Sequence, residues 1–374
     1  MAVFTVALCG ALLVTPLARR TALRLDIVDR PGGRKAHHAP MPYLGGLAIY
    51  VAFMVFLLAA VVRGHNDETP LLQGLAIVAG ATLMVALGLV DDRLALPPSI
   101  KFAGQFLAAF VLFGVGIHFH FTNFPTLDAP VSILWVVGIT NAFNLLDNMD
   151  GLSVGTAAIG CVYFFVLALL EPANKQVLVA SMAIALGGAC LGFLYYNFNP
   201  ARIFMGDAGS LFLGFMLAVL GLKINMNGFP NLHAVNFFVP IVVLGIPIFD
   251  TALVTVSRLR RHVSPLQGGR DHTSHRLVLL GLTVREAVMA LYLVAGALGL
   301  AGIMLTVAHP RSGFALVALL VAAGIVAGYK LEQVYRRSLV GDAPPVAPVA
   351  DAGRPPIVAA DRAALRSKKL KVHR

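Results

Sequence analysis

Residues 71–93 read LLQGLAIVAGATLMVALGLVDDR, an apolar stretch that ends in two aspartates and an arginine. The first twenty residues carry no charge, and about 20 apolar residues in a helix cross a hydrocarbon core about 30 Å thick. Over the whole chain 58% of residues are hydrophobic and 13% are charged, about half the charged fraction of a soluble domain. The pattern therefore predicts an all-α polytopic membrane protein.

Similar apolar segments recur along the chain and predict about eleven transmembrane helices. We place them at 2–18, 44–62, 71–90, 102–117, 131–146, 152–170, 177–196, 208–223, 234–254, 286–308 and 313–330. No basic residue precedes the first segment, and Arg19 and Arg20 follow it, which is the reverse of a cleaved signal peptide. We therefore expect a retained first helix, an N-terminus outside and a C-terminus in the cytoplasm.

The basic residues are distributed as this topology requires. Of 29 lysines and arginines, 25 fall in the loops and the tail assigned to the cytoplasm. The net charge of +11 is therefore a topology signal, and binding to nucleic acid is not expected. We expect a membrane-embedded domain at 1–335 and a disordered basic cytoplasmic tail at 341–374, whose end can rest on anionic lipid headgroups.

Acidic residues gather at the predicted cytoplasmic helix ends, where they are costly unless they meet cations, water or a ligand. Asp91 and Asp92 are adjacent and repel each other, which raises one pKa or recruits a cation, and Lys101 is either a local counter-charge or a phosphate ligand. Asp207 is either the N-cap of the eighth helix or part of a helix N-terminus that an anion can approach. Asp250 is expected only to pair with a nearby arginine.

A row of oxygen-bearing side chains ends the fifth predicted helix. Asn141, Asn144, Asp147 and Asp150 recur every three residues and share one slowly drifting side of a helix. A polar helix end capped by Gly151 explains the glycine but not the row. Carboxylate and amide oxygens at this density suit a hard cation such as magnesium.

Two loops carry basic and imidazole groups. Lys35 and His37 lie in a loop rich in proline and glycine, which by itself is best explained as a topology-holding turn, with phosphate contact as the alternative. Arg270, His272 and His275 suit a pyrophosphate clamp. Zinc is less favoured for these histidines because no HExxH pattern or cysteine pair accompanies them.

Five motifs in order, RKAHHAPMPYLGG, DDRLALPPSIKFAGQ, NAFNLLDNMDGL, ARIFMGDAGS and GRDHTSHRL, resemble those of the polyprenyl-phosphate N-acetylhexosamine-1-phosphate transferases, glycosyltransferase family 4. The similarity runs from about Asp29 to Arg276. It implies eleven spans and transfer of a sugar 1-phosphate from a UDP-sugar to a polyprenyl phosphate such as undecaprenyl phosphate, with release of UMP. It also implies a multi-pass protein of the bacterial inner membrane with a cytoplasmic active site.

The resemblance assigns roles position by position. Asn144 and Asp207 look like ligands of Mg2+, with Mn2+ as an alternative ion, and Asp91 and Asp92 look like the paired catalytic aspartates, with the choice of a base left open. The substrate-binding residues that it implies are Lys101, Asp147, Asp150, Phe204, Arg270, His272 and His275, with Asp150 and Phe204 at the uracil.

The spacing of the histidines in the last motif differs from that of some family members and bears on the identity of the sugar donor. Thr273 and Ser274 separate His272 from His275, whereas muramoyl-pentapeptide transferases have three consecutive histidines. We therefore expect N-acetylglucosamine 1-phosphate as the transferred group, for cell-envelope polysaccharide synthesis, with phospho-N-acetylmuramoyl-pentapeptide transfer as the alternative. An ion-coupled transporter would place its acids near the membrane midplane, which the pattern disfavours, and a structural scaffold does not explain the oxygen row. A homodimer stays open.

Overall fold

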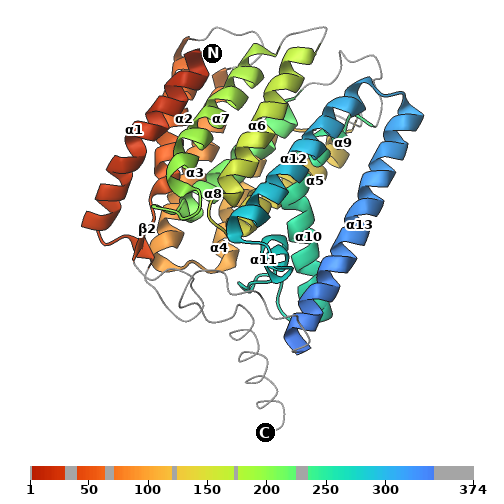
Figure 1. The fold of residues 1–374 in the computed structure, drawn as a ribbon. Coiled ribbons are helices and arrows are strands. Elements are labelled where there is room, and N and C mark those ends of the chain that lie inside the picture. Colours follow the sequence, from red (N-terminus) through yellow and green to blue (C-terminus); the bar gives the residue numbers. More distant parts are fainter. Residues whose placement is uncertain are drawn as a thin grey trace.

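The computed structural model describes residues 2–29, 40–63, 71–119, 124–171, 176–224 and 235–340. Helices dominate the described part (Figure 1). They are α1 (Ala2–Arg24), α2 (Gly45–Arg63), α3 (Leu71–Leu94), α4 (Pro98–Gly114), α5 (Pro125–Leu146), α6 (Leu152–Leu170), α7 (Val177–Asn197), α8 (Gly206–Lys223), α9 (Phe238–Val243), α10 (Gly245–Arg260), α11 (Thr273–Leu279), α12 (Val284–Val307) and α13 (Pro310–Val340). A short antiparallel ladder pairs β1 (Val28–Asp29) with β2 (Met41–Pro42).

Eight of the described helices have the length and apolar composition to cross a membrane, namely α1, α3, α5, α6, α7, α8, α12 and α13. Shorter apolar stretches lie in α2 and α4. The segment predicted at 234–254 is divided into α9 and α10 at Leu244. Pro247 lies in the first turn of α10, where its missing N–H costs no helical hydrogen bond. These helices confirm the all-α polytopic class.

Helix α8 forms the centre of the bundle and is almost wholly buried against α3, α5 and α2. Glycines allow this close approach, because a Cβ on Gly88 of α3 or Gly46 of α2 would overlap backbone atoms of Ala208 and Gly209. Small residues at helix contacts let backbones come together in this way. The first turn of α8, with Asp207, is therefore held at the ends of α2 and α3.

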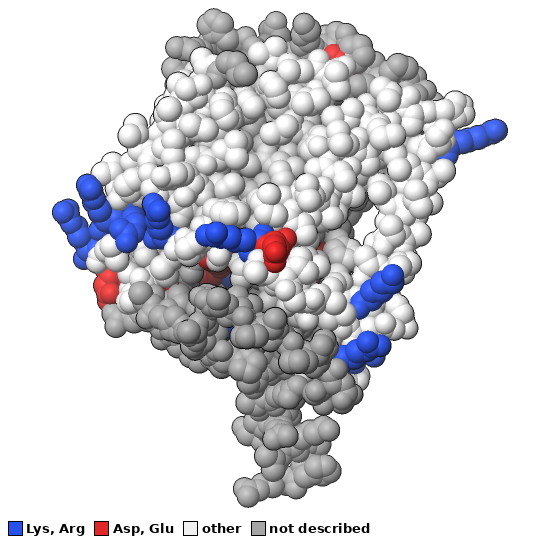
Figure 2. Space-filling view, viewed as in Figure 1, with Lys and Arg blue, Asp and Glu red and all other residues white. Residues whose placement is uncertain are grey.

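The charged side chains of the described residues are unevenly distributed over the face drawn in Figure 2. On the face drawn in Figure 2, most lysines and arginines lie in a band below a broad uncharged surface, and the end of α1 carrying Arg19, Arg20 and Arg24 belongs to this band. We call this end, where α11 also lies, the site end (Figure 1). Helix α13 lies at the edge of the bundle. The predicted tail at 341–374 lies outside the described residues.

Candidate active site

The adjacent aspartates at the end of α3 have different partners. Asp91 accepts hydrogen bonds from Lys101 Nζ at 2.7 Å and from the backbone N–H of Leu96 at 2.6 Å. Asp92 accepts the backbone N–H of Asp207 at 2.8 Å and that of Ala208 at 3.3 Å. Asp91 therefore pairs with a cation, whereas Asp92 satisfies two of the N–H groups that a helix leaves open at its N-terminus.

This arrangement corrects the interpretation of Asp207 as the N-cap of its own helix. Asp207 lies inside the first turn of α8, whose N-cap position is Met205. Asp92 provides the cap from another helix, and Gly206, with φ of 72°, turns the chain into α8. The Asp207 carboxylate is consequently directed to other partners.

Lys101 joins two of the predicted clusters. Its Nζ lies 2.7 Å from Asp91 Oδ2 and 3.0 Å from Asp207 Oδ2, so one ammonium bridges two carboxylates. Asn144 Nδ2 donates to the other oxygen, Oδ1, of Asp207 at 3.0 Å and to Ser210 Oγ at 2.9 Å. Residues from α3, α4, α5 and α8 therefore meet around a single carboxylate.

The oxygen row at the end of α5 divides between two tasks. Asn141 bonds to Gln105 of α4 and to the carbonyl of Val137, so it ties helices together. Asp150 accepts Asn199 Nδ2 at 2.9 Å and the N–H of Ala201 at 3.0 Å, which fixes the segment before α8. Of the four, only Asn144 directly contacts the Asp207 carboxylate among the described residues.

Asp147 ends α5 and adds a further acid near this group. Burial raises the pKa of Asp147 well above its ordinary value, and the negative charges of Asp207, Asp92 and Asp150 add to the effect. A carboxyl group with a raised pKa binds a proton readily, and a bound cation would compete with that proton. Asp147 is therefore not a solvated helix end, and its role as a substrate contact stays a prediction.

Tyr43 is a site residue that sequence reasoning left without a role, although it lies in the PMPYLGG motif. Burial, followed by the charges of Asp92, Asp207 and Asp147, raises the pKa of Tyr43 to about 12, so its hydroxyl stays protonated. The centroid of its ring lies 6.1 Å from that of Phe204. An aromatic pair therefore borders the acidic group.

A histidine of the final motif pairs with an aspartate of α10. His272 Nδ1 lies 2.8 Å from Asp250 Oδ2, and Asp250 Oδ1 accepts the N–H of Thr273 at 2.6 Å. Asp250 had been expected only to pair with an arginine, and this expectation is wrong, because its partners lie at the start of α11. With Nδ1 held in this way, the His272 ring has a fixed orientation and its other nitrogen can serve a ligand.

His275 lies beside His272, with their ring centroids 5.9 Å apart. Burial, together with the charges of His272 and Arg270, lowers the pKa of His275 to about 3, so this ring is neutral at pH 7. Its Nδ1 is buried without a hydrogen-bond partner among the described residues. A neutral imidazole with an unused nitrogen suits a contact to a polar ligand.

The histidine motif and the oxygen row are physically joined. Ser274 Oγ donates to Asn148 Oδ1 at 2.6 Å, linking the start of α11 to the turn between α5 and α6. Lys35 and His37 lie outside the described residues. Segments of the other four motifs that carry the family resemblance are connected by the bonds described above.

The oxygen atoms around Asp207 are candidate ligands for a magnesium ion. Among the described residues no three His, Cys, Asp or Glu side chains are grouped as a metal site. Magnesium, however, usually keeps several waters and takes one or two carboxylates together with substrate phosphates. Asp207 with Asn144 and Asp91 supplies such oxygens, and the ammonium of Lys101 already lies between the two carboxylates. The residues fit a divalent cation.

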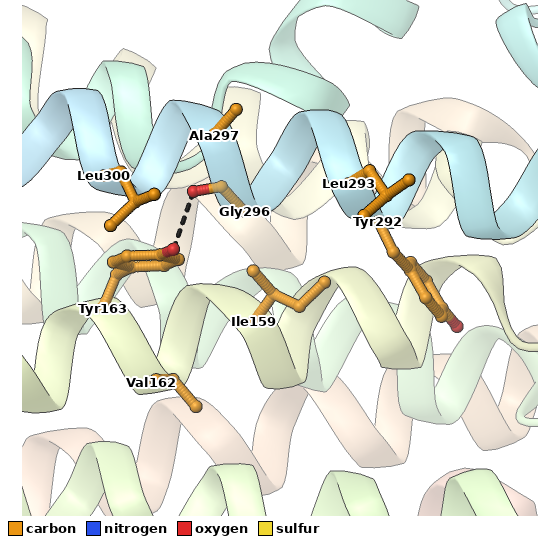
Figure 3. Close-up of a pocket in the computed structure, with 8 residues that line it drawn as sticks. All are labelled: Ile159, Val162, Tyr163, Tyr292, Leu293, Gly296, Ala297 and Leu300. Carbon is orange, nitrogen blue, oxygen red and sulfur yellow. Dashed lines mark hydrogen bonds between the residues drawn. The ribbon is translucent and has the colours of Figure 1, made fainter.

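The described cavity elsewhere in the bundle lacks these properties. A groove of about 520 Å³ runs between α6 and α12, lined mainly by Ile159, Val162, Leu293 and Leu300 with Tyr163 and Tyr292 (Figure 3). Tyr163 donates to the carbonyl of Gly296 at 2.7 Å, and Tyr292 donates to that of Gly151. With both hydroxyls engaged, the groove offers little to a charged substrate.

The sequence of the chain is similar to that of several known proteins. Residues 74–225 match glycosyl transferase family 4. The chain is 36% identical over 311 residues, 81% of its length and 84% of the relative's, to a Bacillus subtilis (strain 168) protein named "Probable undecaprenyl-phosphate N-acetylglucosaminyl 1-phosphate transferase". It is 37% identical over 313 residues, 75% of its length and 76% of the relative's, to the decaprenyl-phosphate N-acetylglucosaminephosphotransferase of Mycolicibacterium smegmatis.

A third relative, the undecaprenyl-phosphate alpha-N-acetylglucosaminyl 1-phosphate transferase of Escherichia coli (strain K12), is 25% identical over 333 residues, 85% of this chain and 87% of the relative. The region that matches glycosyl transferase family 4, residues 74–225, contains the four residues that meet in the candidate site, Asp91, Lys101, Asn144 and Asp207. The chain therefore belongs to glycosyl transferase family 4, among the polyprenyl-phosphate N-acetylhexosamine-1-phosphate transferases.

Proposed function

We propose that the protein transfers N-acetylglucosamine 1-phosphate from UDP-N-acetylglucosamine to undecaprenyl phosphate and releases UMP. The observation that carries the proposal is the junction at Asp207, which contacts Lys101 at 3.0 Å and Asn144 at 3.0 Å. This junction combines a cation with oxygen ligands, which are the groups that diphosphate chemistry needs. The names of the relatives in Bacillus and Escherichia support the same donor sugar and acceptor.

The topology that we propose places this site at the membrane surface. Eleven crossing segments, an N-terminus outside and a C-terminus in the cytoplasm put the site end on the cytoplasmic side of the bacterial inner membrane. The isoprenoid tail then stays in lipid while its phosphate lies at the interface, and the nucleotide arrives from water. The segregation of charge toward the site end supports this orientation (Figure 2).

The main task of the site is electrostatic. An anionic lipid phosphate must approach an anionic diphosphate, so the residues must neutralise charge and align the attack. Asp207 and Asn144, with Asp91 nearby, would hold Mg2+ or Mn2+, which when bound would neutralise charge on the diphosphate. Lys101 and Arg270 would add positive charge from the protein, with His272 and His275 completing the contacts to diphosphate or sugar.

A strong base is not required for this reaction. A phosphate monoester has a second pKa near 6, so the acceptor is largely ionised at neutral pH. Asp92 is engaged by two backbone N–H groups, and Asp91 is engaged by Lys101 and Leu96. We therefore assign Asp92 to holding α8 and Asp91 to orienting Lys101. Asp150 and Phe204, with Tyr43 beside Phe204, would contact the nucleoside.

The test is a reaction with purified protein. The protein is incubated with undecaprenyl phosphate, Mg2+ and UDP-N-acetylglucosamine, and separately with UDP-N-acetylgalactosamine or UDP-muramoyl-pentapeptide, and the lipid product is identified. Asp207→Ala should abolish UMP release, whereas Asp26→Asn, which changes an exposed acid at φ of 54°, should leave it intact. Wild-type turnover by Asp207→Ala would refute the metal role, and a lipid product only from another donor would refute the sugar.

A further inference from the structure

Helix α13 buries polar residues at one end only. Between Pro310 and Leu331 only Gly313 is buried, and most other side chains in this length are exposed. Glu332, Tyr335 and Ser338, in its last turns, are buried at 6%, 2% and 0% exposure. Residues three apart share a face of a helix, so these three form one buried polar face at the site end. Lipid contact does not explain such a face.

Glu332 holds a buried arginine of the histidine motif. Arg276 Nη1 donates to Glu332 Oε2 at 2.8 Å, and the Arg276 side chain has 0% exposure. Arg276 Nε donates to the main-chain carbonyl of Asp271 at 2.8 Å. The other carboxylate oxygen of Glu332 accepts from Arg336 at 2.9 Å, but that arginine is 55% exposed. Of the two ion pairs of Glu332, the one with Arg276 is therefore the desolvated one, and its stability depends most on good geometry.

Tyr335 packs between two arginines. The guanidinium carbons of Arg261 and Arg276 lie 5.0 Å and 4.9 Å from the centroid of its ring. Such cation–π contacts strengthen where the cation is desolvated. Because Arg261 Nη2 also donates to Asp271 Oδ2 at 2.6 Å, the ring helps to hold a second contact to the same aspartate.

Asp271 is thus fixed through both its main chain and its side chain. Arg258 adds a bidentate pair, with Nη2 at 2.7 Å and Nε at 3.0 Å from the Asp271 carboxylate. Although burial opposes the charged form, the hydrogen bond and charge of Arg258, with the charges of His272 and Arg261, hold the pKa of Asp271 below its ordinary value. The residue that directly precedes His272 is therefore held by three arginines.

We propose that Glu332 and Tyr335 are positioning residues that act through Arg276 to hold His272 and His275 in place. Helix α11 has only 7 residues and is too short to be stable alone, so its orientation depends on tertiary contacts. Besides Asp250 and Asn148, α13 supplies such a contact, the Glu332–Arg276 pair, from 56 residues further along the chain. The inference rests on the proposed function, in which the two histidines contact the donor.

The kinetic test compares two changes around Glu332. Glu332→Gln removes the charge that faces Arg276, and we expect kcat/KM for the UDP-sugar to fall about 10- to 100-fold with a raised donor KM, because an error near 1 Å can cost about 100-fold. The KM for undecaprenyl phosphate should stay within about twofold of wild type. Glu332→Asp, which restores the charge, should recover part of the loss.

Arg336→Gln is the matched control, because it breaks the exposed pairing of the same carboxylate and leaves Arg276 paired. It should keep wild-type donor KM and kcat. A loss of folded protein alone would lower the apparent kcat of Glu332→Gln and leave its donor KM unchanged, and that result would overturn the proposal. If Glu332→Gln does not fold, Tyr335→Leu carries the same test, since it keeps the Glu332–Arg276 ion pair.

Amide hydrogen exchange separates this inference from the proposed reaction, because it needs no turnover. Exchange in 268–279 should become faster in Glu332→Gln than in Arg336→Gln, while exchange in α8 is unchanged. If wild-type protein makes no lipid product, the proposed function fails. The exchange result still decides whether Glu332 holds the segment that carries His272 and His275. If wild-type protein is active and Glu332→Gln and Tyr335→Leu both match it in donor KM and in exchange, the positioning role is refuted.

Discussion

Replacing Lys101 with Met should strengthen the binding of the divalent ion and slow the reaction. The Lys101 ammonium lies 2.7 Å from an Asp91 oxygen and 3.0 Å from an Asp207 oxygen, the position from which a divalent ion would draw its carboxylate ligands. A bound ion must displace the ammonium from at least one of these oxygens. The variant no longer makes this competing contact, so we expect it to bind the ion more tightly while it reacts more slowly.

The size of the effect follows from these contacts. A hydrogen bond to a charged group contributes about 1.5–3 kcal/mol. If the ion no longer has to displace the Lys101 ammonium from such a bond, ion binding tightens about 10- to 150-fold. The side chains of Lys101 and Asp207 are 22% and 31% exposed, so water weakens the contact and the lower part of this range is expected. Turnover should fall about 100-fold or more, because the variant lacks a positive charge beside the diphosphate.

Manganese binding to the purified protein, followed by electron paramagnetic resonance at pH 8, measures the affinity without turnover, and UMP release measures the rate. Lys223→Met is the matched control, because Lys223 ends the same helix that Asp207 begins and donates to Gln73 Oε1 at 2.9 Å. It should leave manganese affinity unchanged. Equal or weaker manganese binding by Lys101→Met would refute the idea that the ammonium occupies the place of the ion.

Three further outcomes follow from the structure. Gly88→Ala should lower both the unfolding temperature and activity, because its Cβ would overlap the backbone of α8, whereas Gly114→Ala, with no atom within 4 Å of its Cβ, should change neither. Asp250→Asn should reduce kcat about 100-fold in the UMP assay, since its amide would donate to His272 and leave the wrong tautomer facing the ligand. Folded His275 stays neutral to about pH 3, whereas the unfolded side chain takes a proton below about 6.5. Protons therefore favour unfolding, and wild-type protein should lose up to about 2 kcal/mol more than His275→Gln between pH 6.5 and 5 in denaturant titrations, while equal losses would contradict the shift.

The sequence by itself determined the class of the protein and the end at which its chemistry gathers. Apolar runs near 20 residues predict helices in lipid because each helix satisfies its own backbone hydrogen bonds, which is a local property. Asp91, Asn144 and Asp207 could be singled out in the same way, since acids and amides at the ends of apolar helices are costly without a ligand. Motif order then favoured the family to which the chain belongs.

Only the tertiary structure decided what each of these groups does. Asp91 and Asp92 are neighbours with the same chemistry, yet one faces Lys101 and the other caps α8 by accepting the N–H of Asp207, 115 residues away. Asp250 was expected to pair with an arginine, but packing brings His272 to it instead. Packing likewise brings Arg276 to Glu332, from 56 residues away in the sequence. Hydrogen bonds across the bundle depend on the positions of whole helices, which glycine contacts at α8 set, and no local pattern encodes those distances.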